Sequence, residues 1–182
     1  MSRNLQFRTV LFQPYAQAIG EMTLAWNDFH MVLSSVFDTA TRIPNRMAPT
    51  AIWNSIKSDR VQRDMLESLI ELKALQFNLR TKMHKELKWI QSETTKLEEL
   101  RNNAIHSPLL EEPKGQIIAW HQLGNKRAKG LAGKNLLKEF HRFYETILVW
   151  REYAATLERI MWAVNVPLPA RPQLPNKGQK NS

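Results

Sequence analysis

The chain contains no cysteine, which excludes disulfide bonds and thiolate metal sites. This absence fits a reducing compartment, and we expect a cytoplasmic location. No apolar run approaches the length that spans a membrane, and the opening Met-Ser-Arg-Asn-Leu-Gln-Phe-Arg lacks the apolar core of a signal peptide. The sequence therefore predicts no membrane partner.

Acidic residues are too few to balance the basic ones. The chain has 26 Lys and Arg against 17 Asp and Glu, a formal net charge of +9. Such a balance favours polyanions such as nucleic acid, or serves solubility alone, with anionic membrane surfaces as the weaker choice. The sequence has no Gly-rich phosphate loop, no His-Glu-x-x-His motif and no convergent acidic cluster. We therefore expect no metal site and no cofactor.

Glycine and proline are both absent between Pro49 and Pro108, so helices can continue through this stretch. We expect a polar lead-in over residues 1–13, a helix from Pro14 to about Asp38 and a loop over residues 39–49. Further helices are predicted from near Thr50, from an N-cap at Ser58-Asp59, and from Asn135 onward. A single helix through residues 59–106 would exceed a compact domain of this size, so a break is expected near residues 76–80. One long straight helix remains the alternative.

Apolar residues at helical spacing predict which faces are buried. The short helix near Thr50 should bury Ile52, Trp53 and Ile56. The longer stripes are Tyr15, Ile19, Met22, Trp26, Phe29, Leu33 and Val36; Met65, Leu69, Leu72, Gln76, Leu79 and Met83; and Leu136, Phe140, Phe143, Ile147, Trp150, Ala154, Leu157, Met161 and Val164.

One segment is predicted to be non-helical. Residues 116–120, Gln-Ile-Ile-Ala-Trp, read as a short strand, Gly124-Asn125 as a turn, and residues 125–129 as a strand that pairs back. The fold class is therefore all-α, an antiparallel helical bundle with a small β-hairpin before the last helix. A single domain is expected over residues 1–166, followed by a Pro-rich, basic, disordered tail over residues 167–182.

The most informative stretch lies at the end of a long helix. Its apolar stripe runs Met83, Leu87, Ile90, Thr94 and Leu97, and the next position on the stripe is Arg101. A guanidinium therefore occupies a place where the pattern asks for a core residue. Because Pro108 disfavours helical geometry at the residue before it, the helix should end at about His106. A permanent charge and a group that titrates near neutrality are then about a turn and a half apart.

A structural interpretation of these two residues is open as well. Basic side chains in the last turn of a helix complement its dipole, which accounts well for His106. Arg101 could be a satisfied buried ion pair, or a side chain whose stem is covered while its head reaches water. His106 and Ser107 are adjacent, but neighbours at a helix end rarely aim at each other, so a serine nucleophile is disfavoured.

The hexapeptide Arg101-Asn102-Asn103-Ala104-Ile105-His106 resembles the Arg-polar-x3-His signature of the HEPN superfamily. Members of that superfamily are α-helical domains. Many are metal-independent ribonucleases of toxin–antitoxin, CRISPR-associated and phage-defence systems, and the motif lies at the end of a long helix with Asn often after the Arg. The resemblance covers the hexapeptide, while the all-helical pattern agrees over roughly residues 15–165.

The resemblance implies an endoribonuclease of toxin, defence or stress-response type. His106 would serve as general base or acid, Arg101 would stabilise the charge on the phosphorus, and Asn102 would hold the His or the phosphate. It also implies a homodimer whose two motifs face one cleft, and an antitoxin or other regulator as a partner. The alternative is a catalytically inactive helical module for RNA or protein binding and dimerisation, because many HEPN domains act as scaffolds.

Basic residues follow the motif closely in sequence. Lys126, Arg127 and Lys129 lie in the predicted hairpin and Lys134 just after it, with Glu139 the one acidic residue between Lys114 and Arg142. A solvated surface explains any single lysine. As a group they are predicted to contact the RNA backbone.

Overall fold

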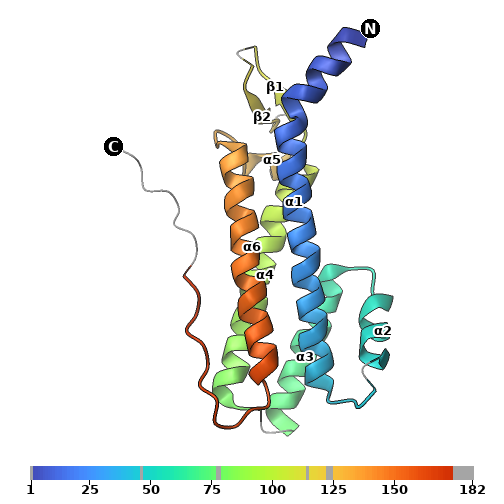
Figure 1. The fold of residues 1–182 in the computed structure, drawn as a ribbon, viewed down its shortest axis with the longest axis vertical. Helices are drawn as coiled ribbons and strands as arrows, with labels where there is room; N and C mark the ends of the chain where they lie inside the picture. Colours follow the sequence, from blue (N-terminus) through green and yellow to red (C-terminus); the bar gives the residue numbers. More distant parts are fainter. Residues whose placement is uncertain (1, 46, 77–78, 114, 122–124, 174–182) are drawn as a thin grey trace. The chain divides into compact units, whose positions relative to one another are not determined.

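The computed structural model describes residues 2–45, 47–76, 79–113, 115–121 and 125–173. The chain is an all-α helical bundle with one antiparallel hairpin before the last helix (Figure 1). In order, its elements are α1 (Ser2–Thr41), α2 (Met47–Ser55), α3 (Asp59–Gln76), α4 (Thr81–His106), β1 (Leu109–Glu111), β2 (Ile117–Ala119), α5 (Lys126–Lys129) and α6 (Leu136–Ile160). Among the described helices, none combines the length and the apolar character that a membrane span needs.

The chain divides into two compact units, and helices α1, α4 and α6 contribute residues to both. The first unit comprises Met1–Trp26 and Leu97–Ile147, and the second comprises Asn27–Lys96 and Leu148–Ser182. The Arg-Asn-x3-His motif, the hairpin and α5 all belong to the first unit. The single domain over residues 1–166 stays a prediction.

The stripes expected for the first and last helices are confirmed. On α1, Met22, Trp26, Phe29, Leu33 and Val36 are at most 2% exposed. On α6 every stripe residue from Leu136 to Met161 is buried, whereas Val164, beyond the end of the helix, is 78% exposed. The 3.6-residue period of the apolar side chains therefore specifies how both helices face the core.

The buried face of α3 is shifted by one residue from the predicted face. Leu66 and Ile70 are 1% exposed, whereas Leu72 of the predicted stripe is 41% exposed, and the Gln76 side chain lies outside the described residues. The buried face is completed by two basic residues, Arg63 and Lys73. The Lys73 ammonium donates to the Thr41 carbonyl at the end of α1, at 3.2 Å, which satisfies a carbonyl that the helix leaves without a partner. Because a hydropathy pattern counts such residues as polar, it misplaces the face.

Helix α1 begins earlier than predicted. The polar lead-in over residues 1–13 is wrong from Ser2 onward, since the helix runs from there through Pro14 to Thr41. Proline lacks an N–H and so removes one backbone hydrogen bond without ending the helix. The first turns of the ribbon are set at an angle to the rest of α1 (Figure 1), as expected for a helix with an interior proline.

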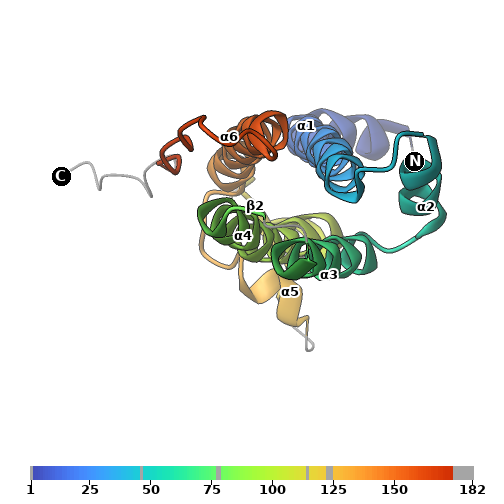
Figure 2. The ribbon, with the colours of Figure 1, turned by 90° about the horizontal axis from the view of Figure 1, so that it is seen from below.

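The connections on either side of α3 follow the sequence prediction. Ser58 caps α3: its hydroxyl oxygen accepts from the Val61 N–H at 3.4 Å, and its carbonyl accepts from the Gln62 N–H at 3.0 Å. The break before α4 is also confirmed, since α3 ends at Gln76 and α4 begins at Thr81. Trp53 of α2 is buried, and its ring lies tilted against that of Phe37, with the ring centres 5.6 Å apart. Ile52 is 49% exposed, which contradicts its predicted burial. Figure 2 shows α2 outside α1 and α3 within the second unit.

The hairpin is present, but its partner strand was assigned incorrectly. Residues 117–119 form a strand as predicted, and this strand pairs with Leu109–Glu111, in the register Leu110 opposite Ile118. Residues 126–129 instead form α5. The predicted Gly124 turn lies outside the described residues. The preceding segment reaches the strand through a loop that contains Gly115 at φ 75°, a conformation that glycine adopts at little cost.

Part of the segment after α6 is tied to α4 in the second unit. The Arg171 guanidinium donates two hydrogen bonds to the Glu86 carboxylate, at 2.7 and 3.1 Å, and lies 4.4 Å from the Trp89 ring centre. The Tyr153 hydroxyl of α6 donates to the same carboxylate at 2.9 Å. Sequence reasoning gave no sign of this contact. Of the predicted tail over residues 167–182, residues 174–182 lie outside the described residues.

The Glu86 cluster makes stability depend on pH. The hydrogen bonds from Arg171, followed by that from Tyr153, lower the pKa of the Glu86 carboxyl below its ordinary value of 4.5, although burial opposes them. A lowered folded-state pKa stabilises the fold above that ordinary value, and the stabilisation is lost as pH falls through the folded-state pKa. We expect Glu86→Gln to lower the melting temperature at neutral pH, and the difference from wild type to shrink below pH 4.5. Thermal unfolding of Glu152→Gln, an exposed glutamate on α6, is the control; equal losses in both variants would refute the role of Glu86.

Candidate functional site

The motif residues lie in the last two turns of α4, which ends at His106 as predicted. Pro108 follows, and the buried Ser107 donates its hydroxyl to the Asn103 carbonyl, one of the carbonyls that the helix end leaves unpaired. The hydroxyl of Ser107 is therefore engaged as a cap. This position argues further against Ser107 as a nucleophile.

Arg101 continues the buried stripe of α4, as predicted. Leu97 and Ala104 on either side of it along the stripe are 5% and 3% exposed, whereas Arg101 is half-buried. Its guanidinium lies 5.7 Å from the ring centre of Trp26, a residue of α1 that is 1% exposed. The aromatic face covers the charge on one side, and the partial exposure leaves it accessible to solvent. Trp26 was predicted as a core residue, and its contact with Arg101 was missed.

Asn102 has a different relation to each of its two motif partners, Arg101 and His106. Arg101 Nη1 donates to Asn102 Oδ1 at 3.3 Å. Asn102 and His106 are four residues apart on one helix, so they share a face, whereas Arg101 and His106 are about 140° apart around the axis at 100° per residue. The structure records no direct bond between Arg101 and His106. Asn102 is thus bonded to the guanidinium and lies on the helix face that carries the imidazole.

His106 is exposed at the carboxyl end of the helix. No hydrogen bond joins its imidazole to another side chain within the described part of the chain. An exposed imidazole in the last turn can exchange protons with solvent or with a ligand.

The predicted basic residues are carried by α5, a four-residue helix. Asn125 caps it, accepting from the Ala128 N–H at 3.3 Å, and its amide donates to the Trp120 carbonyl at 3.2 Å. Ala128 is fully buried, whereas Lys126, Arg127 and Lys129 are exposed. One small apolar residue therefore anchors the turn, and the three cations point outward.

Helix α5 ends against the motif. A Cβ placed on Gly130 would lie 3.2 Å from the side-chain nitrogen of Asn103, so this glycine permits a close approach between the two segments. The cations of α5 and the motif are thereby neighbours in space, and not only in sequence. The tight contact could not be foreseen, because neither Gly130 nor Asn103 carries a sequence signal for it.

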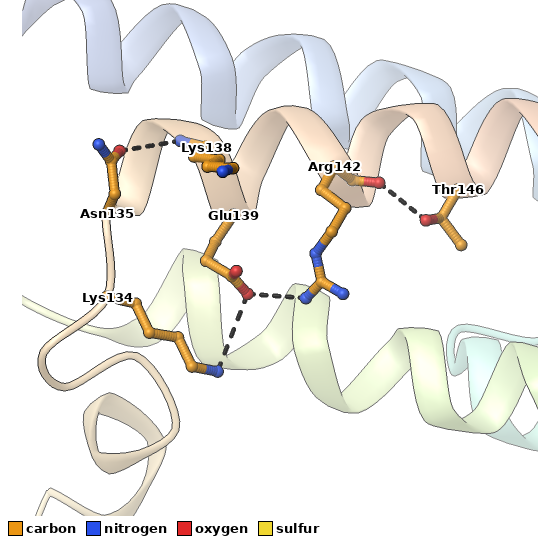
Figure 3. Close-up of polar contacts among 6 residues, drawn as sticks. All are labelled: Lys134, Asn135, Lys138, Glu139, Arg142 and Thr146. Atoms are coloured by element: carbon orange, nitrogen blue, oxygen red, sulfur yellow. Dashed lines mark hydrogen bonds and ion pairs between the residues drawn. The ribbon is translucent and has the colours of Figure 1, made fainter. Parts of the chain in front are cut away.

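Lys134, the fourth predicted RNA contact, lies in the loop before α6. Its ammonium is 3.8 Å from the Glu139 carboxylate, and the same carboxylate oxygen accepts from Arg142 at 2.7 Å (Figure 3). Asn135 caps α6 as predicted, accepting from the Lys138 N–H at 3.0 Å. Lys134 is therefore part of a small charged cluster.

No three or more His, Cys, Asp or Glu side chains are gathered as a metal site among the residues that the structure describes. Comparisons with family models, with curated proteins and with solved structures find no match to this chain.

Proposed function

We propose that the protein is an endoribonuclease that cleaves RNA without a metal ion, with Arg101, Asn102 and His106 as its catalytic residues. The reaction class follows from the resemblance of the hexapeptide to the HEPN signature. A role in a toxin, defence or stress-response system belongs to the same proposal.

In the proposed reaction, His106 removes the proton from a ribose 2′-hydroxyl, and the 2′-oxygen attacks the adjacent phosphorus. The bond from phosphorus to the 5′-oxygen then breaks, and the departing oxygen takes up a proton from a general acid. Arg101 stabilises the negative charge that builds on the phosphoryl oxygens. The products are a 2′,3′-cyclic phosphate and a 5′-hydroxyl.

One observation carries the proposal: an accessible imidazole, an amide and a partly buried guanidinium lie within the last two turns of one helix. Arg101 bonds to Asn102, and Asn102 shares its helix face with exposed His106. The cations of α5 lie beside the same helix end, through the contact of Gly130 with Asn103. This combination supports a site that binds a polyanion and moves a proton.

The single histidine of the motif does not supply both an acid and a base. We therefore include a homodimer in the proposal, in which two copies of the motif face one cleft. The second His106 would protonate the leaving oxygen. Two arginines brought together would repel each other unless an anion lay between them, so RNA would favour the closed arrangement.

A second candidate function is a non-catalytic RNA-binding or protein-binding module. The packing of Arg101 over Trp26 and its bond within its own helix favour this alternative, because both contacts are of a structural kind.

Cleavage of RNA in the presence of EDTA tests the proposed function. We expect purified protein to degrade total RNA in EDTA at the rate seen with Mg²⁺, because no step uses a metal. Binding of RNA without cleavage would favour the non-catalytic module, and cleavage that requires a divalent ion would contradict the mechanism.

A further inference from the structure

Two cations in the first unit converge on a single oxygen atom. Lys134 in the loop before α6 and Arg142 in its second turn both reach Oε2 of Glu139, at 3.8 and 2.7 Å (Figure 3). The three side chains are partly exposed, at 45% for Lys134, 27% for Arg142 and 23% for Glu139. The cluster is thus open to solvent and keeps a net positive charge.

Lys138 adds a further cation on the same helix. It lies four residues before Arg142, so the two share a face of α6, and it is exposed. The Asn135 cap fixes the start of the helix from which these residues project, by accepting from the Lys138 N–H. Two cations therefore contact one carboxylate at the start of α6, and Lys138 adds an exposed positive charge on the same helix.

We infer that Lys134 and Arg142 form a site for a backbone phosphate of RNA, and that the Glu139 carboxylate competes with that phosphate by occupying the two cations in the free protein. This inference rests on the proposed function, and it extends that function by assigning the surface that the substrate follows. A phosphate has the same kind of acceptor oxygens as the carboxylate that the cations already hold. When a phosphate binds, both cations turn from Glu139 toward it, and the carboxylate opposes the bound anion.

Substitutions at the cations and at the carboxylate are expected to change RNA affinity in opposite directions. Removing Lys134 and Arg142 removes two phosphate contacts. Removing the charge of Glu139 removes a repulsion and frees the two cations. If the cluster were only a surface ion-pair network, Glu139→Gln would act on RNA affinity no more than loss of any other glutamate on α6.

The test is binding of a single-stranded 2′-O-methyl oligonucleotide, which lacks the hydroxyl that the proposed cleavage needs. Affinity is measured at several salt concentrations for wild type, Lys134→Gln, Lys134→Gln with Arg142→Gln, and Glu139→Gln. We expect the double variant to bind about tenfold more weakly and to flatten the slope of log affinity against log salt by roughly 1.4, because each contact with a single strand contributes about 0.7. Glu139→Gln should bind about twofold or more tightly.

Matched variants separate the effect of this site on RNA affinity from the effect of net charge. Glu145→Gln removes one exposed carboxylate of α6 that contacts His141, and Arg151→Gln removes one exposed cation of the same helix. The inference is overturned if Lys134→Gln and the double variant change RNA affinity and its salt dependence, per lost charge, no more than Arg151→Gln does. It is also overturned if Glu139→Gln changes RNA affinity no more than Glu145→Gln does. A wild-type protein that binds no oligonucleotide contradicts the proposed function together with this inference. Lys134→Gln alters a side chain in the loop before α6, so its result depends less on the folding of the helix than that of the double variant.

Discussion

His106→Ala and Arg101→Ala are each expected to lower the rate of RNA cleavage by at least about 100-fold. General acid–base catalysis by a positioned side chain contributes about 10²–10⁴-fold, and loss of one donor to a developing oxyanion costs about 10²–10³-fold. His106 is exposed at the end of α4, so its replacement leaves the core untouched. The measurement is the initial rate of cleavage of one RNA in EDTA, with protein concentrations matched.

His121→Ala is the control for His106→Ala. This histidine is also exposed, lies in the first unit just after β2, and has no place in the proposed reaction. Arg101→Lys separates charge from shape, because an ammonium cannot make the bidentate contact of a guanidinium. Cleavage at the wild-type rate by both alanine variants would exclude the motif as the catalytic site.

Mixed dimers are expected to show that two copies of the motif share one site. If a site needs His106 from both subunits, then a random mixture of equal amounts of wild-type and His106→Ala chains retains about one quarter of the all-wild-type activity, since only wild-type homodimers are complete. If each chain works alone, about one half remains. The rate is measured after co-refolding of chains that carry different tags.

The corresponding mixture with His121→Ala chains should keep full activity, which controls for losses during refolding. Light scattering at the assay concentration gives the state of association directly. A fully active monomer would contradict both the dimer and the shared site, and leave His106 with a role inside one chain.

Apolar periodicity was enough to predict most of the fold. The stripes of α1 and α6, the end of α4 at His106 and the break after Gln76 follow from helical spacing, from Pro108 and from chain length. The face of α3 was not predictable in this way, because Arg63 and Lys73 occupy buried positions where their partners come from α1. Arg63 lies 3.5 Å from His30 Nε2, and Lys73 bonds to the Thr41 carbonyl. These partners are more than 30 residues away in sequence.

The hairpin shows a second limit of local patterns. Residues 126–129 follow a turn signal, but Ala128 and the Asn125 cap specify a helical turn. The strand at residues 117–119 pairs instead with Leu109–Glu111, which precedes it in the sequence. Strand pairing depends on which segment is close at hand, and a two-stranded register is weakly specified by three residues.

The candidate catalytic residues stay a prediction. Arg101 and His106 were singled out from an interrupted stripe and a proline, and Asn102 from the resemblance to the HEPN signature. The aromatic cover from Trp26, the approach of Gly130 to Asn103 and the cluster at Glu139 all depend on contacts between segments distant in sequence or on rotamers. Only three-dimensional packing brings Trp26 and Gly130 to the last turns of α4.

Analysis of the product ends tests the central claim most directly. A defined RNA oligonucleotide is incubated in EDTA with wild-type protein, with His106→Ala or with His121→Ala, and the fragments are identified by mass. Attack by the 2′-hydroxyl predicts fragments that end in a 2′,3′-cyclic phosphate and begin with a 5′-hydroxyl, formed by wild type and His121→Ala and reduced at least about 100-fold in His106→Ala. Fragments with 5′-phosphate ends, or cyclic phosphates formed equally well by His106→Ala, would contradict the account.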